Sequence, residues 1–172
     1  MKVKDCIFTR RSVRKYKKKK ISDDKINSIL EYALHAPSAC NTQPWQFINV
    51  KDLKTKVKLS NIHKYCSFIK NAGCIIAVCY NPNLCSYKPS DMLSTAVAAQ
   101  NILLGIHNEG LGACWIYVKD DNDTDIEKKV KNILNIPDNI EVLCLISVGY
   151  TDEIPSKKEI KSINDVIHKE TW

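Results

Sequence analysis

The stretch that decides the fold runs from Asp91 to Val118 and reads DMLSTAVAAQNILLGIHNEGLGACWIYV. Its first part is apolar on nearly every face of a helix, which is typical of a buried helix. Pro89 and Ser90, together with the aspartate, supply a helix start with side-chain oxygens able to cap the first free N–H groups. Gly110 supplies the stop, because glycine adopts the left-handed conformation after a helix at almost no cost. We therefore expect a buried central helix.

The segment after this helix begins with Gly110-Leu111-Gly112 and continues as ACWIYV. Ala113–Val118 is short and rich in aromatic and β-branched residues, which favours a buried strand. The central helix is thus expected to lead through a glycine turn into a central strand. A ligand close to this turn would meet backbone amides with no bulky side chains in the way.

The rest of the chain alternates helical and strand patterns around this unit. Ser22 precedes an amphipathic stripe that includes Ile26 and Ile29, and it is a suitable helix cap. The expected elements are a short helix at Lys4–Thr9, a helix from Ser22 to Pro37, a strand at Trp45–Val50, a helix at Lys51–Ser60, a strand at Cys74–Tyr80, the central helix and strand, an acidic cap at Asp120–Thr124, a helix over Ile126–Leu134 and a strand at Val142–Tyr150. This order predicts an α+β fold with helices on both faces of one sheet.

Length and composition indicate one soluble domain. The 172 residues, 44% hydrophobic and 26% charged, are ordinary for a globular chain and are enough to form a substantial core. No run is long and apolar enough to span a bilayer. The N-terminus is charged almost at once and lacks an apolar signal region. We therefore expect residues 1–172 to form a single cytoplasmic domain with no membrane association.

The eight cysteines could bind a metal, form disulfides or remain reduced thiols. They form no C-x-x-C pair and no Cys/His cluster at zinc spacing, so we predict no metal site. Several lie in apolar runs, where a free thiol behaves as a small hydrophobic group. Without a secretory signal, reduced thiols are the favoured interpretation. The cysteines are Cys6, Cys40, Cys66, Cys74, Cys79, Cys85, Cys114 and Cys144.

Positive charge is concentrated near the N-terminus of a chain whose formal net charge is +7. Such a cluster suits nucleic acid, a membrane surface or a phosphorylated small molecule. The run Lys17–Lys20 is most simply a solvated surface, and no aromatic stacking platform accompanies it, so nucleic-acid binding ranks last. Arg10, Arg11 and Arg14 differ, because they are interleaved with Ser12 and can grip a phosphate bidentately and also reach polar ring atoms.

Four strings follow one another in the chain and stand out. They are Arg10-Arg11-Ser12-Val13-Arg14, the loop PSACNTQPW from Pro37 to Trp45, the turn GLGACW from Gly110 to Trp115, and Gly149-Tyr150 followed by Pro155, Lys158, His168 and Trp172. Each string alone has an ordinary structural explanation as a basic segment, a loop or a helix end. No G-x-G-x-x-G follows a strand and no P-loop string is present, so neither type of nucleotide site is indicated.

Taken together, the four strings resemble the nitroreductase family of FMN-dependent oxidoreductases over about Cys6 to Trp172. PSACNTQPW and GLGACW are the most specific parts. The resemblance implies a three-layer α/β/α sandwich with a mixed central sheet. It also implies a homodimer whose flavin sites are shared between subunits. The tail Thr151–Trp172 is long and polar with sparse apolar residues, which favours an extended C-terminal arm laid over another subunit.

The resemblance also implies FMN as the cofactor and assigns residues to it. In the family, the arginine–serine segment binds FMN, the P-S-x-x-N-x-Q loop reaches the flavin, commonly from the partner subunit, and the G-L-G turn lies against the ring through backbone N–H groups. A late lysine helps to grip the phosphate. The implied cofactor-binding residues are Arg10, Arg11, Ser12, Arg14, Pro37, Ser38, Asn41, Gln43, Leu111, Gly112 and Lys158. No catalytic side chain is implied, because the flavin N5 atom carries the chemistry.

Two departures from the family pattern affect the expected site. Many members place an arginine two residues after the late lysine, but here that position is Ile160, and whether Lys161 replaces it stays open. The connection Tyr80–Asp91 is also short, whereas larger members insert helices there that cover the substrate. We therefore expect a more open pocket or a different substrate.

The leading hypothesis is an FMN-dependent oxidoreductase that uses NADH or NADPH to reduce nitro compounds, quinones or a related small acceptor by ping-pong hydride transfer. One alternative keeps FMN but changes the reaction to reductive dehalogenation or dehydrogenation. Another is a protein that binds flavin without turnover. The preferred nicotinamide and the physiological acceptor stay open. His35, His63, His107 and His168 have no partner that the sequence identifies, so no proton-transfer role is predicted for them.

Overall fold

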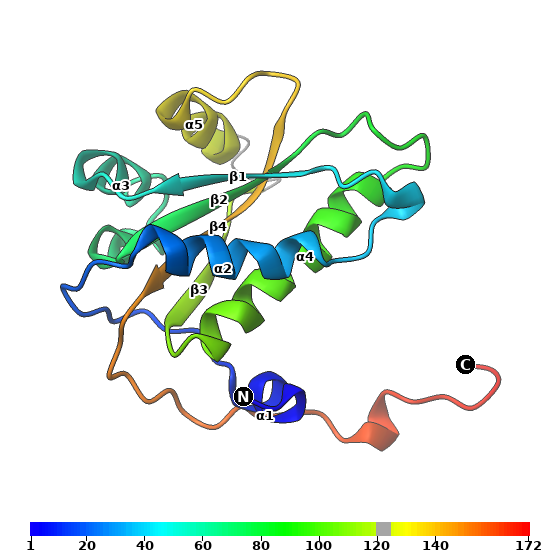
Figure 1. Cartoon of the computed structure of the whole chain (residues 1–172). Helices are drawn as coiled ribbons and strands as arrows, with labels where there is room; N and C mark the ends of the chain where they lie inside the picture. The colour runs from blue at the N-terminus through cyan, green and yellow to red at the C-terminus, as the bar shows by residue number, and fades with distance from the viewer. Residues whose placement is uncertain (120–124) are drawn as a thin grey trace.

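The computed structural model describes residues 1–119 and 125–172. Figure 1 shows helices packed around one sheet, with a C-terminal tail that leads away from it. The helices are α1 (Val3–Thr9), α2 (Asp23–Leu34), α3 (Leu53–Leu59), α4 (Ser90–Asn108) and α5 (Asp125–Leu134), with short 3-10 turns η1 (Ala39–Asn41), η2 (Ser67–Asn71) and η3 (Ile163–Asp165). The strands are β1 (Trp45–Val50), β2 (Cys74–Tyr80), β3 (Gly112–Tyr117) and β4 (Glu141–Gly149).

The four strands form one sheet in the order β1-β2-β4-β3, and each neighbouring pair is antiparallel. The expectation of a mixed sheet, with both parallel and antiparallel strand pairs, is therefore wrong, because this sheet is antiparallel. Strands β2 and β3, which the α4 crossover connects, run in the same direction, but β4 lies between them and opposes both. Parallel pairing among the described residues is limited to an isolated bridge between Ser12 and Ala113.

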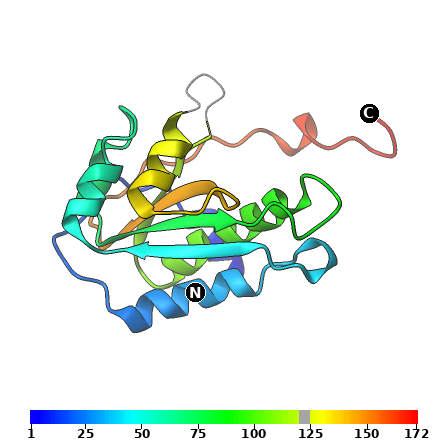
Figure 2. The same cartoon turned by 90° about the horizontal axis from the view of Figure 1, so that it is seen from above.

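The sheet is covered on both faces, which confirms the expected α/β/α layers (Figure 2). Consecutive strand residues point to opposite faces. Ile76 and Ile146 belong to the core beneath α2 and α4, whereas Ile75 and Leu145 belong to the core beneath α3, η2 and α5. All four side chains are fully buried. Each contributes about 1.5–3 kcal/mol by leaving water, so the two apolar layers fix the sheet between the helices.

Helix α4 is buried along most of its length, as its apolar sequence predicts. Its C-terminal end is confirmed: Gly110 has a φ of 71°, and the N–H of Leu111 donates to the carbonyl of Ile106 at 3.0 Å. Its start differs from the expectation. Pro89 is the cap residue, and no side chain caps the helix. Asp91 lies one residue inside the helix and is only 2% exposed, because its carboxylate points toward neighbouring loops.

The outer elements follow the expected pattern with shifted ends. The N–H of Lys25 donates to the Ser22 hydroxyl at 3.3 Å, which confirms the predicted cap of α2, but this helix ends at Leu34, before Pro37. Helix α3 begins after Asp52, whose carboxylate caps it. The predicted acidic cap at residues 120–124 lies outside the described residues. Within the described chain, no helix has both the length and the hydropathy needed to cross a membrane.

Candidate functional site

The segment Arg10–Arg14, called the arginine segment below, follows α1 and lies against the start of β3. Ser12 forms a parallel bridge with Ala113, and the N–H of Val13 donates to the Ala113 carbonyl at 2.8 Å. This close approach depends on Gly112, because a Cβ there would lie 2.8 Å from Val13 Cγ1 and 2.9 Å from Thr151 Cγ2. The glycine turn and the arginine segment, which are far apart in the sequence, therefore form one unit.

The beginning of the C-terminal tail fixes this segment from the other side. One carboxylate oxygen of Glu153 accepts the N–H groups of Arg14 and Lys15, both at 2.8 Å. The hydroxyl of Thr151 donates to the Lys15 carbonyl at 2.8 Å. The hydrogen bond from the Arg14 N–H is the main reason that the pKa of Glu153 lies below its ordinary value of 4.5. The arginine segment is thus held between β3 and the tail.

This contact makes stability depend on pH. Because the pKa of Glu153 is lower in the folded chain, its stabilising effect is complete above the unfolded pKa and is lost as pH falls through the folded pKa. We expect Glu153→Gln to cost about 0.5–1 kcal/mol near neutral pH, since the group is partly solvated. Urea unfolding at pH about 7 and about 3 should show the difference from the wild type shrink in acid. A difference that stays constant with pH would contradict this role.

Tyr16 anchors the end of the segment to the sheet. Its hydroxyl donates to the Val13 carbonyl and pairs with the Ser147 hydroxyl, both at 2.7 Å. Burial raises the pKa of Tyr16 well above its ordinary value, so the phenol stays protonated. A Cβ on Gly149 would lie 2.6 Å from the Tyr16 ring, so glycine is required for this contact as well.

Two cavities flank the arginine segment along β3. The smaller has a volume of about 250 Å³ and is lined by Arg10, Arg11, Leu111 and Gly112, among others. His107 also lines it. Burial and the two arginines lower the pKa of His107, which favours its neutral form. The structure therefore brings together four of the residues that the sequence assigned to FMN.

The larger cavity has a volume of about 860 Å³, within the usual range for small-molecule sites. Arg14 lies in its lining. Aromatic side chains and two further basic groups accompany this arginine. The lining residues are Arg14, His63, Lys64, Tyr65, Phe68, Cys114, Trp115, Ile116, Tyr117 and Ile126. Cations beside aromatic rings suit a planar ligand that carries negative charge.

In the glycine turn Gly110–Gly112, one backbone N–H group that was expected to contact the flavin is already hydrogen-bonded within the chain. The N–H of Leu111, which was expected to face a flavin ring, already donates to Ile106. Leu111 is also only 3% exposed, and Gly112 is packed against Val13 and Thr151. The glycine turn therefore packs directly against the arginine segment.

The loop Pro37–Pro44 lies at the opposite end of α4. The N–H of Ala39 donates to the hydroxyl of Ser94 in the first turn of α4 at 3.2 Å. The Ser38 hydroxyl accepts the Gln43 N–H at 3.0 Å. Helix α4 has 19 residues, which corresponds to roughly 27 Å. Within one chain, the loop and the arginine segment therefore lie near opposite ends of α4.

This loop is conformationally unusual. Cys40, Asn41 and Gln43 have φ angles of 52°, 54° and 46°. The left-handed region costs non-glycine residues roughly 1–2 kcal/mol each. Surrounding contacts must offset this cost, and backbone strain of this kind often marks a functional site.

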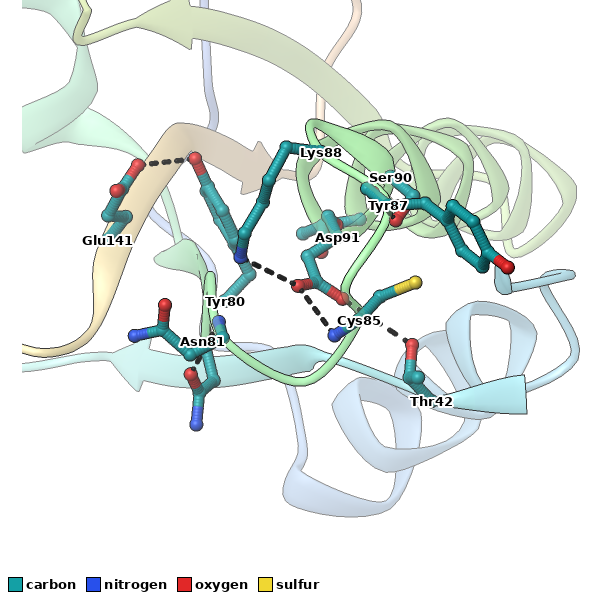
Figure 3. A network of polar contacts seen from close by, with 11 residues as sticks. Thr42, Tyr80, Asn81, Cys85, Tyr87, Lys88, Ser90, Asp91 and Glu141 are labelled. Atoms are coloured by element: carbon teal, nitrogen blue, oxygen red, sulfur yellow. Dashed lines mark hydrogen bonds and ion pairs between the residues drawn. The ribbon is translucent and has the colours of Figure 1, made fainter. Parts of the chain in front are cut away.

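A buried carboxylate fastens the loop to its neighbours (Figure 3). Asp91 accepts the backbone N–H of Cys85 at 3.1 Å and the Thr42 hydroxyl at 3.5 Å. Its third partner is the Lys88 ammonium group at 3.8 Å. The loop before β1, the connection before α4 and the first turn of α4 are thus joined through one side chain.

The remaining predicted contact is Lys158, which is exposed on the tail, as are Ile160 and Lys161. Glu153 and Thr151, which clasp the arginine segment, were not predicted as site residues. The loop Asn61–Asn71 was expected to influence specificity, but its aromatic residues were not singled out. No motif marks any of them. Their importance depends on packing between distant parts of the chain, which only the folded structure reveals.

Comparisons with known proteins identify the family and the fold. The model of the nitroreductase family matches residues 7–72 and 63–150. A relative from Archaeoglobus fulgidus, named "Putative NADH dehydrogenase/NAD(P)H nitroreductase", is 39% identical over 96% of both chains. A Parabacteroides distasonis crystal structure of the same name is 31% identical, covers 98% of this chain and 97% of its own, and has a TM-score of 0.90. An FMN-dependent nitroreductase from Clostridium difficile is 31% identical, covers 99% of this chain and all of its own, and has a TM-score of 0.84.

Proposed function

Because the chain belongs to the nitroreductase family and is therefore an oxidoreductase, we propose that it binds FMN and uses NADH or NADPH to reduce a small acceptor. Nitro compounds and quinones are the acceptor classes that we favour. One observation carries the proposal: the segment Arg10–Arg14 is fixed on β3 between two cavities, one of which is lined by aromatic and basic side chains. The similar structure that is described as FMN-dependent supports the cofactor.

The donor set suits FMN. Arg10 and Arg11 line the smaller cavity and offer guanidinium groups for a phosphate, and Arg14 offers a cation in the aromatic cavity. Ser12 adds a hydroxyl between these arginines in the chain. When bound, FMN supplies hydride acceptance from a nicotinamide and delivery to a second substrate at its N5 atom. Arg14 would stabilise the negative charge of the reduced flavin, and the aromatic walls would exclude water. No side chain of the described residues is assigned a proton-transfer role.

We further propose that each site is completed by a second copy of the chain. The loop with Pro37, Ser38, Asn41 and Gln43 contacts α4 at Ser94, roughly 20 Å along the helix from His107, which lines the cavity beside the arginine segment. These loop residues would reach a flavin held by that segment only from another subunit. The tail supports the same conclusion, because Ile160 and Trp172 are 80% and 101% exposed in the isolated chain. Large apolar side chains that are this exposed commonly pack against a partner.

Removal of the tail should weaken the dimer. We expect deletion of residues 156–172 to raise the dimer dissociation constant at least about 100-fold, because each large apolar side chain returned to water costs roughly 1.5–3 kcal/mol. Size-exclusion chromatography with light scattering over a concentration series measures this. Lys157→Ala is a matched control, since it changes an exposed residue and leaves the apolar side chains in place. A full-length chain that is monomeric at all concentrations would contradict the proposal.

The proposed activity is tested by anaerobic absorbance spectroscopy of the FMN-reconstituted protein. Addition of NADH or NADPH should bleach the flavin bands, and a nitroaromatic compound or quinone should restore them. Arg14→Ala should weaken FMN binding at least about tenfold, the loss expected for one charge-assisted hydrogen bond. A protein that does not bind FMN would refute the proposal. FMN that binds but stays oxidised with both nicotinamides would favour a flavin-binding role without turnover.

A further inference from the structure

His107 lies in the last turn of α4 and lines the smaller cavity together with Arg10 and Arg11. Its ring is half-buried. The hydroxyl of Thr9, the residue before Arg10, contacts the Nε2 atom of this ring at 2.7 Å. The contact joins the end of α4 to the beginning of the arginine segment, so a ligand held by the two arginines would also lie near the histidine.

Hydrogen bonds determine which nitrogen of His107 carries the proton of the neutral ring. The Thr9 hydroxyl has a single proton, which it donates to the Asp5 carbonyl at 2.6 Å. At Nε2 it can therefore only accept, so His107 holds a proton on Nε2 and donates it. Nδ1 then has the lone pair, and a second proton would add there. The ring can thus become charged and keep its contact with Thr9.

In the chain itself, the surroundings of His107 favour its neutral form. Burial lowers its pKa below the ordinary value of 6.5, and the positive charges of Arg10 and Arg11 lower it further. Arg11 is held in place, because its Nη1 atom donates to the Phe8 carbonyl at 2.8 Å. An anion bound by the two arginines would oppose their effect on the ring and favour the protonated form.

Four further charged groups lie near the cavity or near the end of α4. Glu153 lines the cavity, but its carboxylate accepts backbone N–H groups of the arginine segment. Glu109 follows on α4 and pairs with Lys25 at 3.5 Å. Met1 also lines the cavity, and its ammonium group donates to the side-chain oxygen of Asn108 at 3.0 Å. The charge of the cavity lining is therefore mainly positive.

We propose that binding of a phosphate group by Arg10 and Arg11 is coupled to the uptake of a proton by His107, which then acts as a third cation for the phosphate. The proton comes from solvent, adds at Nδ1, and returns to solvent when the phosphate leaves. Because the anion raises the pKa of the ring, affinity should rise as the pH falls through the pKa of the bound state. Above that pKa the ring is neutral in both states and contributes no charge.

FMN carries such a phosphate, whereas riboflavin has the same ring system without it. His107 would then help the chain to distinguish the two flavins, since only FMN supplies the charge that holds the added proton. This assignment to FMN rests on the proposed function, but the response of His107 to a phosphate ion does not.

Nuclear magnetic resonance of the histidine rings in the FMN-free chain tests the proposal. The chain has four histidines, and the signal of His107 is the one missing from His107→Gln. Inorganic phosphate should move the midpoint of its pH titration upward by about one pH unit or more, because a nearby opposite charge favours the protonated ring. Sulfate, whose charge does not change over this range, should move the midpoint in the same direction, which excludes titration of the phosphate itself as the cause.

Flavin binding gives a second measurement. His107→Gln keeps a donor for Thr9 but cannot take up a proton. At pH about 6 this variant should bind FMN at least about threefold more weakly than the wild type, whereas at pH about 8 the two should agree closely. Riboflavin should bind both proteins equally at either pH. His35→Gln is the matched control, since it replaces an exposed histidine at the end of α2, and it should keep the wild-type pH dependence.

A His107 midpoint that neither phosphate nor sulfate changes would refute the coupling. A loss of FMN affinity in His107→Gln that is equal at both pH values would refute it as well, because it would show an uncharged structural contact. If phosphate raises the midpoint but the chain binds no FMN, the proposed function fails and the coupling stands. FMN that binds and is reduced while the midpoint stays fixed would lead to the opposite conclusion.

Discussion

Replacing Gly112 with valine is expected to lower the free energy of unfolding by about 2–3 kcal/mol and FMN affinity at least about 100-fold. The new Cβ would lie 2.8 Å from Val13 Cγ1 and 2.9 Å from Thr151 Cγ2. Val13 is only 5% exposed, and Thr151 is held by its bond to Lys15, so neither neighbour can move freely. The arginine segment would be pushed off β3, and its charge-assisted contacts with a ligand would be lost.

Gly110→Ala is the matched control. A Cβ at Gly110 has no neighbour within 4 Å, but the φ of 71° makes any side chain unfavourable. This change should cost about 1 kcal/mol in stability and leave FMN affinity nearly unchanged. Urea unfolding and fluorescence titration with FMN measure both quantities. Equal FMN affinities for Gly112→Val and the wild type would show that binding does not depend on the segment's position on β3.

Replacing Asp91 with alanine is expected to destabilise the fold by about 2–3 kcal/mol, because the buried N–H of Cys85 would lose its acceptor. Asp91→Asn keeps a side-chain oxygen for that N–H. Its amide group replaces the oxygen that accepts from Thr42 and can donate to that hydroxyl instead. The main loss is the ion pair with Lys88, whose side chain is 54% exposed, so the change should cost about 1 kcal/mol or less.

Urea unfolding of both Asp91 variants, with the cysteines kept reduced, separates the two contributions. The alanine variant should also loosen the loop Pro37–Pro44, since Thr42 would lose its contact. Faster amide hydrogen exchange in residues 38–43 would report this change. If the alanine and asparagine variants are equally stable, the carboxylate does not fasten the loop in the way proposed.

Local signals in the sequence predicted much of the fold. The apolar run of α4, the stop at Gly110 and the Ser22 cap each depend on residues close together in the chain, and the structure confirms all three. The family resemblance likewise predicted the layered fold. These features are readable because helix periodicity and capping require only neighbouring residues.

Strand order and side-chain direction could not be predicted in the same way. Periodicity does not reveal that β4 lies between β2 and β3, because strand pairing depends on contacts between distant residues. Asp91 has the sequence signature of a helix cap, yet it is buried and serves two loops. The sequence also gave no indication that Glu153 clasps the backbone of Arg14.

The family resemblance named the proposed cofactor residues and implied that two subunits share them, but the sequence does not show where they lie within one chain. The resemblance assigned Arg10, Asn41 and Leu111 to one cofactor, whereas one chain puts Asn41 at the far end of α4 from the other two. The engaged N–H of Leu111 and the packing of Gly112 likewise depend on tertiary contacts. A linear motif thus identified which residues to consider, and the structure determined which of them one chain can bring together.

A subunit complementation experiment tests the shared site most directly. One variant combines Arg10→Ala with Arg14→Ala, and the other combines Asn41→Ala with Gln43→Ala. Each variant alone should bind little FMN. If each flavin is held by the arginine segment of one chain and the loop of the other, co-expression should restore about a quarter of the wild-type FMN content, because half of the dimers are mixed and each has one intact site. No restoration in dimers shown to be mixed would contradict a site shared between subunits.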